Sequence, residues 1–518
     1  MVRQRFGAVL IAVMVAVTAL GSAPLRARGA SGFPARYLVL IVMDGFRPDY
    51  MSLAPMRHVR ALMRSGMAYK RAWVGQLETE TPTGHATIVT GTYPKKHGVV
   101  GFGWRAPNGS YVWMPTDLRQ LKAGLMESLI EAGGAPTISD LMHRKYPGSK
   151  SASMSGEKYY AADAMGTGAD YILYSHALKR GMEVLPIGQH VPPPSTRYQT
   201  TDTRDDAYPW LQDKLVGSVA VRLLATIRPQ TMLVNLPGSD IEGHLTGGIV
   251  DKQDMRNEAR HADAAIGAIV DAYKRAGLYS RTLFVVTADH GMVPNTHVVP
   301  IKRMYGGIRA TGAPTLEDDL LTTAGYVFLR DPADAAVVAS RLSGRHFPWV
   351  EGALYRSPAG SGYAFHASHD TETSLGPAVT RAYLDLANTL AAPSGPEVVL
   401  PYREDTMGLT VRGSGPHWGN HGGLSWRVQH IPLVISGPGV AHSVSWFPAQ
   451  LVDIAPTIER LLDLPIPAAV DGVVLADALK RAQPDDVAAQ RGVAARRSQD
   501  VRALMQHSRA QNGIALGE

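Results

Sequence analysis

The sequence predicts an α/β fold with a mostly parallel central sheet, helices on both faces and an inserted cap. Short apolar runs rich in β-branched residues are typical of strands buried on both faces, and helical patterns lie between them. Residues 254–277 show apolar spacing of about 3.6 and end on a glycine, as expected of a helix. The strand-like runs are "YLVLIVM" at 37–43, "TMLVNL" at 231–236, "TLFVVT" at 282–287 and "IPLVIS" at 431–436.

Length and composition are those of an ordinary globular protein. The chain has 518 residues, 45% of them hydrophobic and 19% charged, and can bury a large core. It contains no cysteine, so core packing, helped by metals, must stabilise it without disulfides. The formal net charge is +7, and removing the four arginines of the first 30 residues leaves +3. This charge does not favour a nucleic-acid partner.

The N-terminus has the order of a secretory signal, with basic "MVRQR", an apolar run at 6–20 and then "GSAPLRARGA". The apolar run is shorter than the roughly 20 residues that span a membrane, and no later stretch is long enough. We therefore expect a signal peptide at 1–30, cleaved after Ala27 or Ala30, rather than an anchor. The mature protein is expected to be periplasmic or secreted from a bacterium, without stable membrane insertion.

The rest of the chain is expected to form one main domain at 36–475. Two segments within it, 102–228 and 300–418, are richer in Pro, Gly and polar residues and are interpreted as cap insertions over the sheet edge. The last segment, 482–518, has several arginines and little apolar periodicity, which is typical of a flexible tail. No feature of the sequence specifies an oligomeric state.

Metal-type side chains follow three of the predicted strands. Asp44 follows the run at 37–43, Asp240 follows "LVNLPGS", and Asp289 with His290 follows the run at 282–287. Open parallel sheets bind ligands outside the carboxyl ends of their strands, so these side chains are expected to lie together. Taken alone, the Asp-Gly pair that begins at Asp44 is more typical of a turn.

Two further motifs contain candidate ligands. In "DIEGH", Asp240 and His244 are four residues apart, which lets an oxygen and a nitrogen converge on one ion in a helical turn. An ordinary surface pair is an equal alternative. In "GNHGG", small residues surround His421 and allow close backbone approach to a site. A structural loop histidine is the alternative there, and His417 is a nearby competitor.

The stretch "TETPTGHATIVTGTYP" contains a candidate nucleophile. Thr81 precedes a proline and a helical pattern, so its side chain can cap that helix. Backbone amides at a helix N-terminus also favour an anion, so a phosphate bonded to the Thr81 hydroxyl would be stabilised. The two roles are compatible.

As a set, these motifs resemble the alkaline phosphatase superfamily, specifically its type I phosphodiesterase/nucleotide pyrophosphatase and threonine-nucleophile phosphatase branch. The resemblance rests on "MDG", "TPTGHATIVTGTYPKKHGVVG", "DIEGH", "TADHGM", "GNHGG", "IPLVISGPG" and "LVDIAPTIERLLDLPIPAAVDGVVL", which occur in the right order between residues 37 and 475. It implies an alkaline phosphatase-like catalytic domain with two zinc ions, although other divalent metals also suit these ligand types. It implies one zinc ion bound by Asp44, Thr81, Asp289 and His290, and the other by Asp240, His244 and His421. His85 and His97 lie in the same region and are interpreted as structural.

The sequence departs from these relatives at two positions that would contact the phosphoryl oxygens. Phe102 stands where relatives usually have an asparagine that donates a hydrogen bond. In "EKYYAAD", Lys158 matches the Lys-Asp-Arg-like stretch of threonine phosphatases, but Tyr160 stands at the arginine. A phenol does not replace the paired hydrogen bonds of an arginine.

The resemblance implies a phosphate-ester hydrolase in which Thr81 attacks phosphorus and forms a phosphothreonine, while Lys158 neutralises charge on the remaining oxygens. Because Phe102 and Tyr160 supply apolar surface and little charge, we expect a small-molecule phosphodiester or nucleotide pyrophosphate substrate. One alternative is an alkaline phosphomonoesterase of the same superfamily. Another is a non-catalytic protein that binds zinc and phosphorylated ligands.

Overall fold

The structure is a computed structural model that describes most of the chain. The predicted leader at 1–30 and His417 lie outside the described residues, so export stays a prediction. Within the described ranges, no helix combines the length and the apolar character needed to cross a membrane. The described residues are 35–113, 121, 124–176, 179–185, 209–249, 253–319, 323–408 and 418–512.

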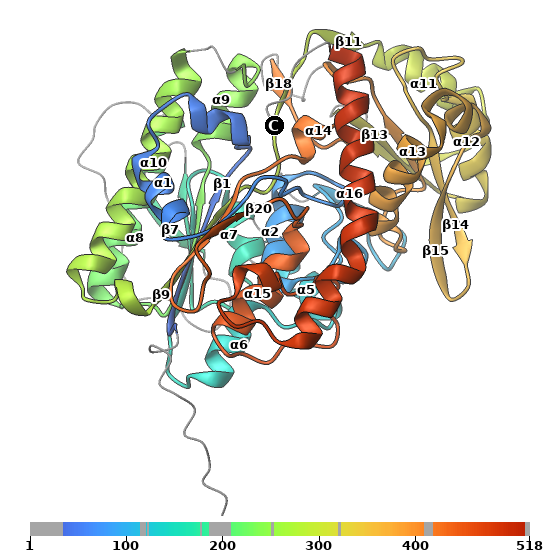
Figure 1. The fold of residues 1–518 in the computed structure, drawn as a ribbon. Helices are drawn as coiled ribbons and strands as arrows, with labels where there is room; N and C mark the ends of the chain where they lie inside the picture. Colours follow the sequence, from blue (N-terminus) through green and yellow to red (C-terminus); the bar gives the residue numbers. More distant parts are fainter. Residues whose placement is uncertain are drawn as a thin grey trace, which may run out of the picture.

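A nine-stranded sheet forms the centre of the molecule, with β1 (Tyr37–Met43) in its middle (Figure 1). β1 pairs in parallel with β8 (Thr231–Leu236) and β9 (Thr282–Thr287), whose residues are all buried. Continuous apolar sequences suit strands covered on both faces, and the prediction of a mostly parallel sheet is confirmed. Beyond β9 lie β19 (Leu433–Ser436), β2 (Gly66–Tyr69) and β20 (Ser443–Ser445), and beyond β8 lie β5 (Ser151–Ser155), β6 (Tyr171–His176) and β7 (Lys179–Leu185).

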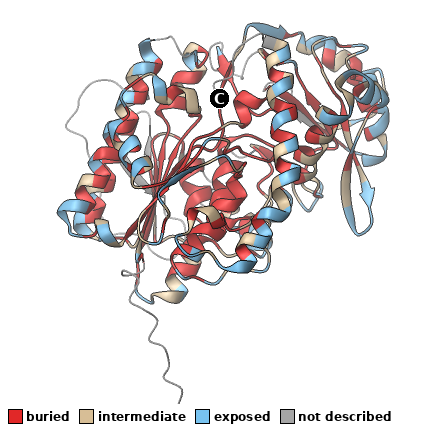
Figure 2. Ribbon diagram, viewed as in Figure 1, coloured by how far each residue is buried: buried red, intermediate tan, exposed pale blue. Residues whose placement is uncertain are grey.

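Helices cover both faces of this sheet. One layer contains α1 (Arg57–Arg64), α8 (Pro209–Thr226) and α10 (Gln253–Arg275), and α10 confirms the helix predicted at 254–277. The other layer includes α2 (Thr81–Thr90) and α7 (Tyr159–Gly166). Figure 2 shows the buried strands between the two layers, whose outer helical faces are exposed.

Residues from about 300 onwards build a second sheet beside the first (Figure 1). Its five strands are antiparallel, and it is accompanied by α11 (Ile301–Arg309), α12 (Ala335–Arg341) and α13 (His369–Ala387). Whether this unit covers a bound substrate stays a prediction. The strand order is β12 (Thr315–Asp319), β13 (Ala324–Leu329), β16 (Val398–Pro401), β14 (Leu354–Ala359) and β15 (Gly362–Ala367).

The interpretation of 102–228 as a cap is wrong for much of that segment. Three of its strands, β5, β6 and β7, extend the central sheet, and α7 and α8 pack against that sheet. β5 is fully buried, but its sequence "SASMS" is rich in serine, so hydropathy does not predict a buried strand there. Hydrogen bonds outside the sheet ladder satisfy these serines, and Ser153 Oγ, for example, donates to Ala162 O at 2.6 Å.

The prediction of a flexible tail at 482–518 is wrong over most of its length, because α16 (Pro484–Asn512) is one long helix. It runs beside α13 and α14 (Trp426–Gln429), as Figure 1 shows. Its few apolar contacts, including buried Val501 and Leu504, are supplemented by ion pairs with other segments. Because ion pairs do not require apolar residues at helical spacing, the sequence of α16 shows little apolar periodicity.

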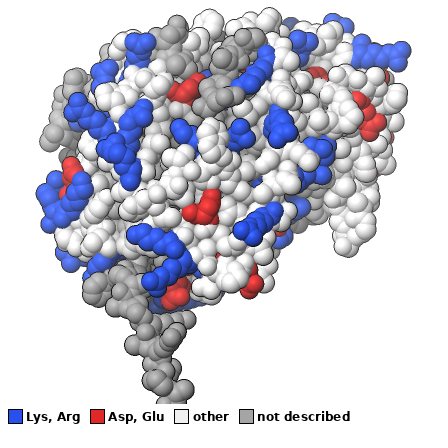
Figure 3. All heavy atoms as spheres, viewed as in Figure 1, with Lys and Arg blue, Asp and Glu red and all other residues white. Residues whose placement is uncertain are grey.

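The basic side chains are dispersed on the face drawn in Figure 3. Lys and Arg are spread over this face and are more prominent than Asp and Glu, in keeping with the formal charge of +7. On this face they do not gather into a stripe of the kind that follows a nucleic-acid backbone.

Candidate active site

Three strand ends bring three carboxylates together at one edge of the central sheet. Asp44 follows β1, Asp240 lies on α9 (Gly238–Thr246) after β8, and Asp289 follows β9, and all three are fully buried. Gly45 has a φ of +65°, and a Cβ at this position would lie 2.9 Å from Asp240 Cβ. The glycine of "MDG" therefore permits both a left-handed backbone and close packing against Asp240.

The Thr81 hydroxyl points at these carboxylates. Thr81 is the first residue of α2, and no side chain caps this helix, so the capping role for Thr81 is wrong. Its Oγ1 lies 3.4 Å from Asp44 Oδ1 and 3.4 Å from His290 Nε2. Gly84 allows α2 to come this close, because a Cβ there would lie only 2.8 Å from Asp289 Cβ.

The three predicted histidine ligands share one orientation. The Nδ1 atoms of His244, His290 and His421 each face a backbone carbonyl oxygen, at 2.8, 2.9 and 2.9 Å respectively. A carbonyl only accepts, so Nδ1 carries the proton and Nε2 presents its lone pair. The Nε2 atoms all face carboxylates, at 3.2 Å for His244 to Asp240, 3.3 Å for His421 to Asp240 and 3.4 Å for His290 to Asp289. Metal-ligating histidines are held in this way.

These atoms form compact groups that suit metal ions. The candidate ligand atoms of Asp240, His244 and His421 lie within 4.8 Å of one another. Another such group comprises Asp44, Asp240 and His290, and His290 Nε2 is also 3.5 Å from Asp44 Oδ1. The structure thus gathers all seven residues predicted for the metal site, Thr81 included, and their role as ligands stays a prediction.

His85 also lies beside the carboxylates, but both of its ring nitrogens have partners. Nδ1 faces the Thr81 carbonyl oxygen at 2.7 Å, and Nε2 is 2.9 Å from the Asn235 amide nitrogen. Its position within 4.8 Å of Asp44 and Asp289 makes it a candidate ligand by distance alone. Because its lone pair already accepts from Asn235, the interpretation of His85 as structural is the better one. His97 likewise bonds the Thr87 hydroxyl at 2.9 Å.

The electrostatics of the group favour a bound cation. Among the described residues, Asp240 Oδ1 and Asp289 Oδ2 are buried without a hydrogen-bond partner. Burial, with the nearby Asp44 charge, raises the pKa of Asp289. Burial also lowers the pKa of His421 to about 3, with the His290 ring stacked on it at 3.7 Å adding to the effect. Buried carboxylates and imidazoles are the ligands that zinc binds, so these residues fit such an ion.

Lys158 reaches into the same group. Its Nζ lies 2.9 Å from Asp44 Oδ1 and 3.3 Å from Thr81 Oγ1, and it also contacts Asp240 Oδ2. The side chain is buried at the start of α7, so its charge is stabilised by these two carboxylates. Neutralisation of substrate charge by Lys158 stays a prediction.

Phe102 and Tyr160 lie together at the side of the site. Their ring centroids are 5.2 Å apart with the planes at 85°, an edge-to-face contact. The Phe102 backbone nitrogen donates to Glu80 Oε2 at 2.9 Å, which holds Phe102 beside the residue that precedes Thr81. Both rings are half-buried, so part of each is open to a ligand.

The sequence-based prediction missed Asn235. Its amide nitrogen donates to Asp44 Oδ2 at 2.8 Å and to His85, and its amide oxygen accepts from Ser155 Oγ at 2.7 Å. Asn235 therefore orients one candidate ligand from behind. The available signal was a lone asparagine inside the buried apolar run "TMLVNL".

Sequence comparison identifies the family. Residues 38–352 match the family described as type I phosphodiesterase / nucleotide pyrophosphatase. The chain belongs to this family. The match covers more than half of the sequence and confirms the resemblance stated from the motifs.

Among relatives of this phosphodiesterase-family chain, the bis(5'-adenosyl)-triphosphatase enpp4 of Mus musculus is 25% identical over 265 residues, which are 51% of this chain and 48% of the mouse protein. The venom phosphodiesterase of Macrovipera lebetinus is 25% identical over 266 residues, which are 51% of this chain and 26% of that protein. The chain spans about half the length of the enpp4 relatives it matches.

Solved structures resemble the family member over most of its length. Murine ectonucleotide pyrophosphatase / phosphodiesterase 5, in complex with AMP, aligns with a TM-score of 0.56 and 17% identity, covering 84% of this chain and 96% of that one. Wild-type alkaline phosphatase PafA aligns with a TM-score of 0.64 and 14% identity, covering 86% and 100%. At these identities the likeness shows the fold alone, and it confirms the alkaline phosphatase-like α/β architecture.

Proposed function

We propose that the protein is a metal-dependent hydrolase that cleaves phosphodiester or nucleotide pyrophosphate bonds through a phosphothreonine intermediate at a two-zinc site. The observation that carries this proposal is the shared orientation of His244, His290 and His421. Each Nδ1 is held by a carbonyl oxygen, and each Nε2 faces a buried carboxylate beside the Thr81 hydroxyl.

The Thr81 hydroxyl is the nucleophile in this proposal. When bound, zinc ions at these ligands lower the pKa of a hydroxyl or water and stabilise charge on phosphoryl oxygens. Thr81 Oγ1 forms a bond to phosphorus while the bond to the leaving oxygen breaks, and the leaving group takes that electron pair and a proton. Water then breaks the bond between Thr81 Oγ1 and phosphorus, which frees the hydroxyl and releases the phosphorylated product.

The chain's own residues fix the geometry of this reaction. The helix N-terminus that begins at Thr81 directs backbone amides toward an anion bonded to the hydroxyl. Lys158, 3.3 Å from Thr81 Oγ1, lies where its charge offsets that of the phosphoryl oxygens. Asn235 holds Asp44 in place from the neighbouring strand.

A diester or pyrophosphate substrate fits this site better than a monoester. A monoester has two negative charges, whereas Phe102 and Tyr160 offer aromatic surface and no cation. A second organic group, such as a nucleoside, can pack against these rings. The names of one relative, a bis(5'-adenosyl)-triphosphatase, and of one structural neighbour, a phosphodiesterase in complex with AMP, support a nucleotide substrate.

The decisive experiment compares the wild type with Thr81→Ala on bis(para-nitrophenyl) phosphate and para-nitrophenyl phosphate, after loading with zinc. We expect the wild type to hydrolyse both, the diester faster, and Thr81→Ala to lose at least about a thousandfold in kcat. Thr81→Ser is the matched control, because it keeps a hydroxyl at the same position.

Metal analysis of the same samples should find two zinc ions per chain, with Asp240→Ala reducing this number. Hydrolysis by Thr81→Ala at a rate close to that of the wild type would refute the phosphothreonine. A strong preference for the monoester would favour the phosphomonoesterase alternative. Zinc binding without any turnover by the wild type would favour the non-catalytic binding protein.

A further inference from the structure

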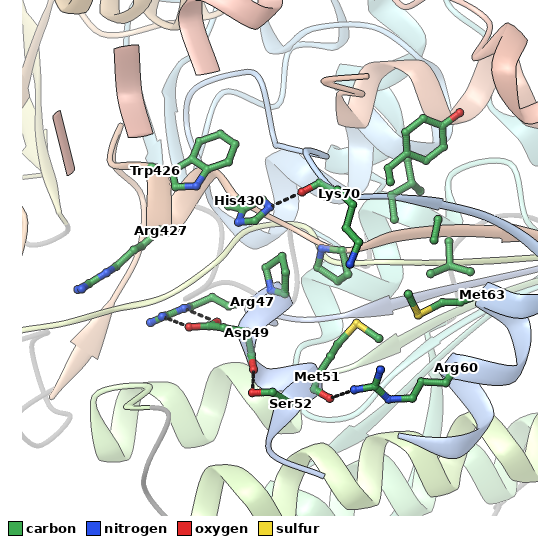
Figure 4. Close-up of a pocket in the computed structure, with 16 residues that line it drawn as sticks. Arg47, Asp49, Met51, Ser52, Arg60, Met63, Lys70, Trp426, Arg427 and His430 are labelled. Atoms are coloured by element: carbon green, nitrogen blue, oxygen red, sulfur yellow. Dashed lines mark hydrogen bonds and ion pairs between the residues drawn. The ribbon is translucent and has the colours of Figure 1, made fainter. Parts of the chain in front are cut away.

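A cavity of about 280 Å³ lies on the β2 side of the central sheet, between η1 (Pro48–Ser52), α1 and α14 (Figure 4). None of the candidate metal ligands lines it. The volume equals that of about nine water molecules, at the small end of the range for ligand pockets. It is large enough for a small molecule.

Two cations border this cavity without an acidic partner. Figure 4 shows Lys70 entering it from the end of β2 and Arg60 bordering it from α1. The Arg60 guanidinium donates only to the carbonyl oxygens of Pro55 and Met51, at 3.1 and 2.8 Å. Among the described residues, neither Arg60 nor Lys70 forms an ion pair with a carboxylate. Both side chains are exposed and can bind an anion without breaking an existing pair.

The other basic groups of the cavity wall are already compensated. Arg47 donates from Nε to Asp49 Oδ1 at 3.0 Å and from Nη1 to Met292 O at 3.2 Å. Arg427 Nε lies 3.2 Å from Glu404 Oε1. These interactions hold the cavity wall in place. An anionic ligand would therefore contact Arg60 and Lys70 rather than Arg47 or Arg427.

Much of the remaining lining is apolar or aromatic. Met51 and Met63 supply flexible thioether side chains, which adapt to the shape of a ligand. The His430 ring is held by a 3.1 Å contact between its Nε2 and the Lys70 carbonyl oxygen, and it stacks on Trp426 at 4.6 Å. A cavity lined by two cations without ion pairs and by apolar surface suits a ligand that has both an anionic group and an apolar body.

We propose that this cavity binds a small amphiphilic anion, in which one phosphate or carboxylate group is joined to a compact apolar body. Lys70 and Arg60 bind the anionic group, and Met51, Met63 and the His430 ring pack against the body. Phosphate and carboxylate share the chemistry that these two cations recognise.

The cavity is lined by the segment that follows Asp44, and α14, which also lines it, is hydrogen-bonded to the segment that follows His290. Arg47 lies on the loop that begins with Asp44, and Gly291, next to His290, donates its backbone nitrogen to Val428 O at 2.6 Å. A ligand in the cavity therefore lies beside Arg47, three residues after Asp44, and outside the reaction site itself.

The test uses the full-length protein as purified and follows para-fluorobenzoate, para-fluorophenylphosphonate and neutral para-fluorobenzyl alcohol by fluorine NMR titration. We expect both anions to bind saturably and the alcohol not to bind. In the double variant R60Q/K70Q, the dissociation constant for benzoate should rise about tenfold or more. For the phosphonate, which the site of the proposed function would also bind, the number of sites should fall by one. Comparison of the two anions identifies the preferred head group.

Arg64→Gln is the matched control, because Arg64 is exposed on the same helix and does not line the cavity. Met63→Trp keeps both charges but fills the cavity, and it should block benzoate as well. Thermal unfolding establishes that each variant is folded. Equal affinity in the wild type and R60Q/K70Q, binding of the neutral alcohol as tight as that of the anions, an equal loss in Arg64→Gln, or no saturable binding would each overturn the proposal.

Discussion

The Asn235 side-chain amide donates a hydrogen bond to Asp44 Oδ2 at 2.8 Å, from β8 to the end of the adjacent strand β1. This bond engages Asp44 Oδ2, so that Oδ1 faces Thr81, His290 and the Lys158 ammonium on the side of the candidate ligands. Asn235 thus occupies the position of an outer partner that orients a ligating carboxylate.

Asn235→Ala is expected to weaken metal binding about 10- to 100-fold, because Asp44 loses the donor that fixes its orientation. Competition with a chromogenic chelator measures the affinity. Asn257→Ala is the matched control, since Asn257 lies on α10 and bonds Gln253. Unchanged affinity in Asn235→Ala would show that packing alone orients Asp44.

Lys158→Met should destabilise the metal-free protein by about 3–5 kcal/mol, because it leaves Asp44 and Asp240 buried without their cation. Bound metal ions supply replacement charge, so the loss in the free energy of unfolding should shrink in the zinc-loaded protein. Urea unfolding with and without a chelator measures both values. Lys150→Met removes a half-exposed lysine from Asp170, which keeps its contacts with His143 and the Ser151 backbone nitrogen, so it should cost about 1 kcal/mol or less in either state. Equal losses for Lys158→Met in both states would contradict the prediction.

The candidate site was largely predictable because its ligands sit at strand ends. The strands before Asp44 and Asp289 are continuous apolar runs, and parallel strands of one sheet deliver their carboxyl ends to one edge. Local spacing within "DIEGH" placed His244 one turn after Asp240 on α9. These signals are local in sequence, and the parallel topology of the sheet brings the separate motifs together at one edge.

The features that were predicted wrongly or missed depend on contacts with residues far away in the sequence. The serines of β5 look polar, yet Ser155 is buried against Asn235, about eighty residues later. Asn235 is itself polar in an apolar strand, and only the folded arrangement shows that it bonds both Asp44 and His85. Hydrogen bonds between distant segments leave no periodic trace in the sequence, so hydropathy patterns do not reveal them.

Arg497 tests how α16 is bound to the domain. Its guanidinium forms two hydrogen bonds with the buried Asp453 carboxylate, at 2.5 and 3.1 Å. Arg497→Ala should lower the free energy of unfolding by about 3 kcal/mol, the low end for a broken buried pair, because backbone amides of Gln450 and Val473 still donate to Asp453. The measurement is urea unfolding.

The neighbouring residue provides the control for that measurement. Arg496 pairs with Asp385 at the surface and is 52% exposed, so Arg496→Ala should cost only about 1 kcal/mol or less. Equal effects of the two substitutions would mean that the Arg497 pair does not attach the helix.

Glu459 on α15 (Ile454–Leu461) should make stability depend on pH. It is fully buried, and neither carboxylate oxygen has a hydrogen-bond partner among the described residues. Burial raises its pKa to about 8. The unfolded chain loses this proton near its ordinary pKa of about 4.3, whereas the folded protein keeps it up to about pH 8. Within that window, Glu459 lowers the free energy of unfolding by about 1.4 kcal/mol per pH unit as the pH rises.

Glu459→Gln removes this titration, so the stability of the variant relative to the wild type should increase from about pH 5 to about pH 8 and then level off. Urea unfolding across this range measures the difference. Glu131→Gln, at an exposed position of α5 (Leu125–Ala132), should show no such trend. A pH-independent difference for Glu459→Gln would mean that the carboxyl is ionised in the folded protein.

Phe102 tests the choice between diester and monoester substrates. Phe102→Asn introduces an amide donor at the position where relatives usually have asparagine. A hydrogen bond to a charged oxygen contributes about 1.5–3 kcal/mol. The dianionic monoester gains most from it, so the ratio of monoester to diester kcat/KM should rise about tenfold or more. Phe102→Leu removes the edge-to-face contact with Tyr160 without adding a donor, and should reduce diester turnover while leaving monoester turnover nearly unchanged. A parallel change in both substrates for Phe102→Asn would show that Phe102 does not face the phosphoryl group, and that the aromatic pair affects the site only through packing.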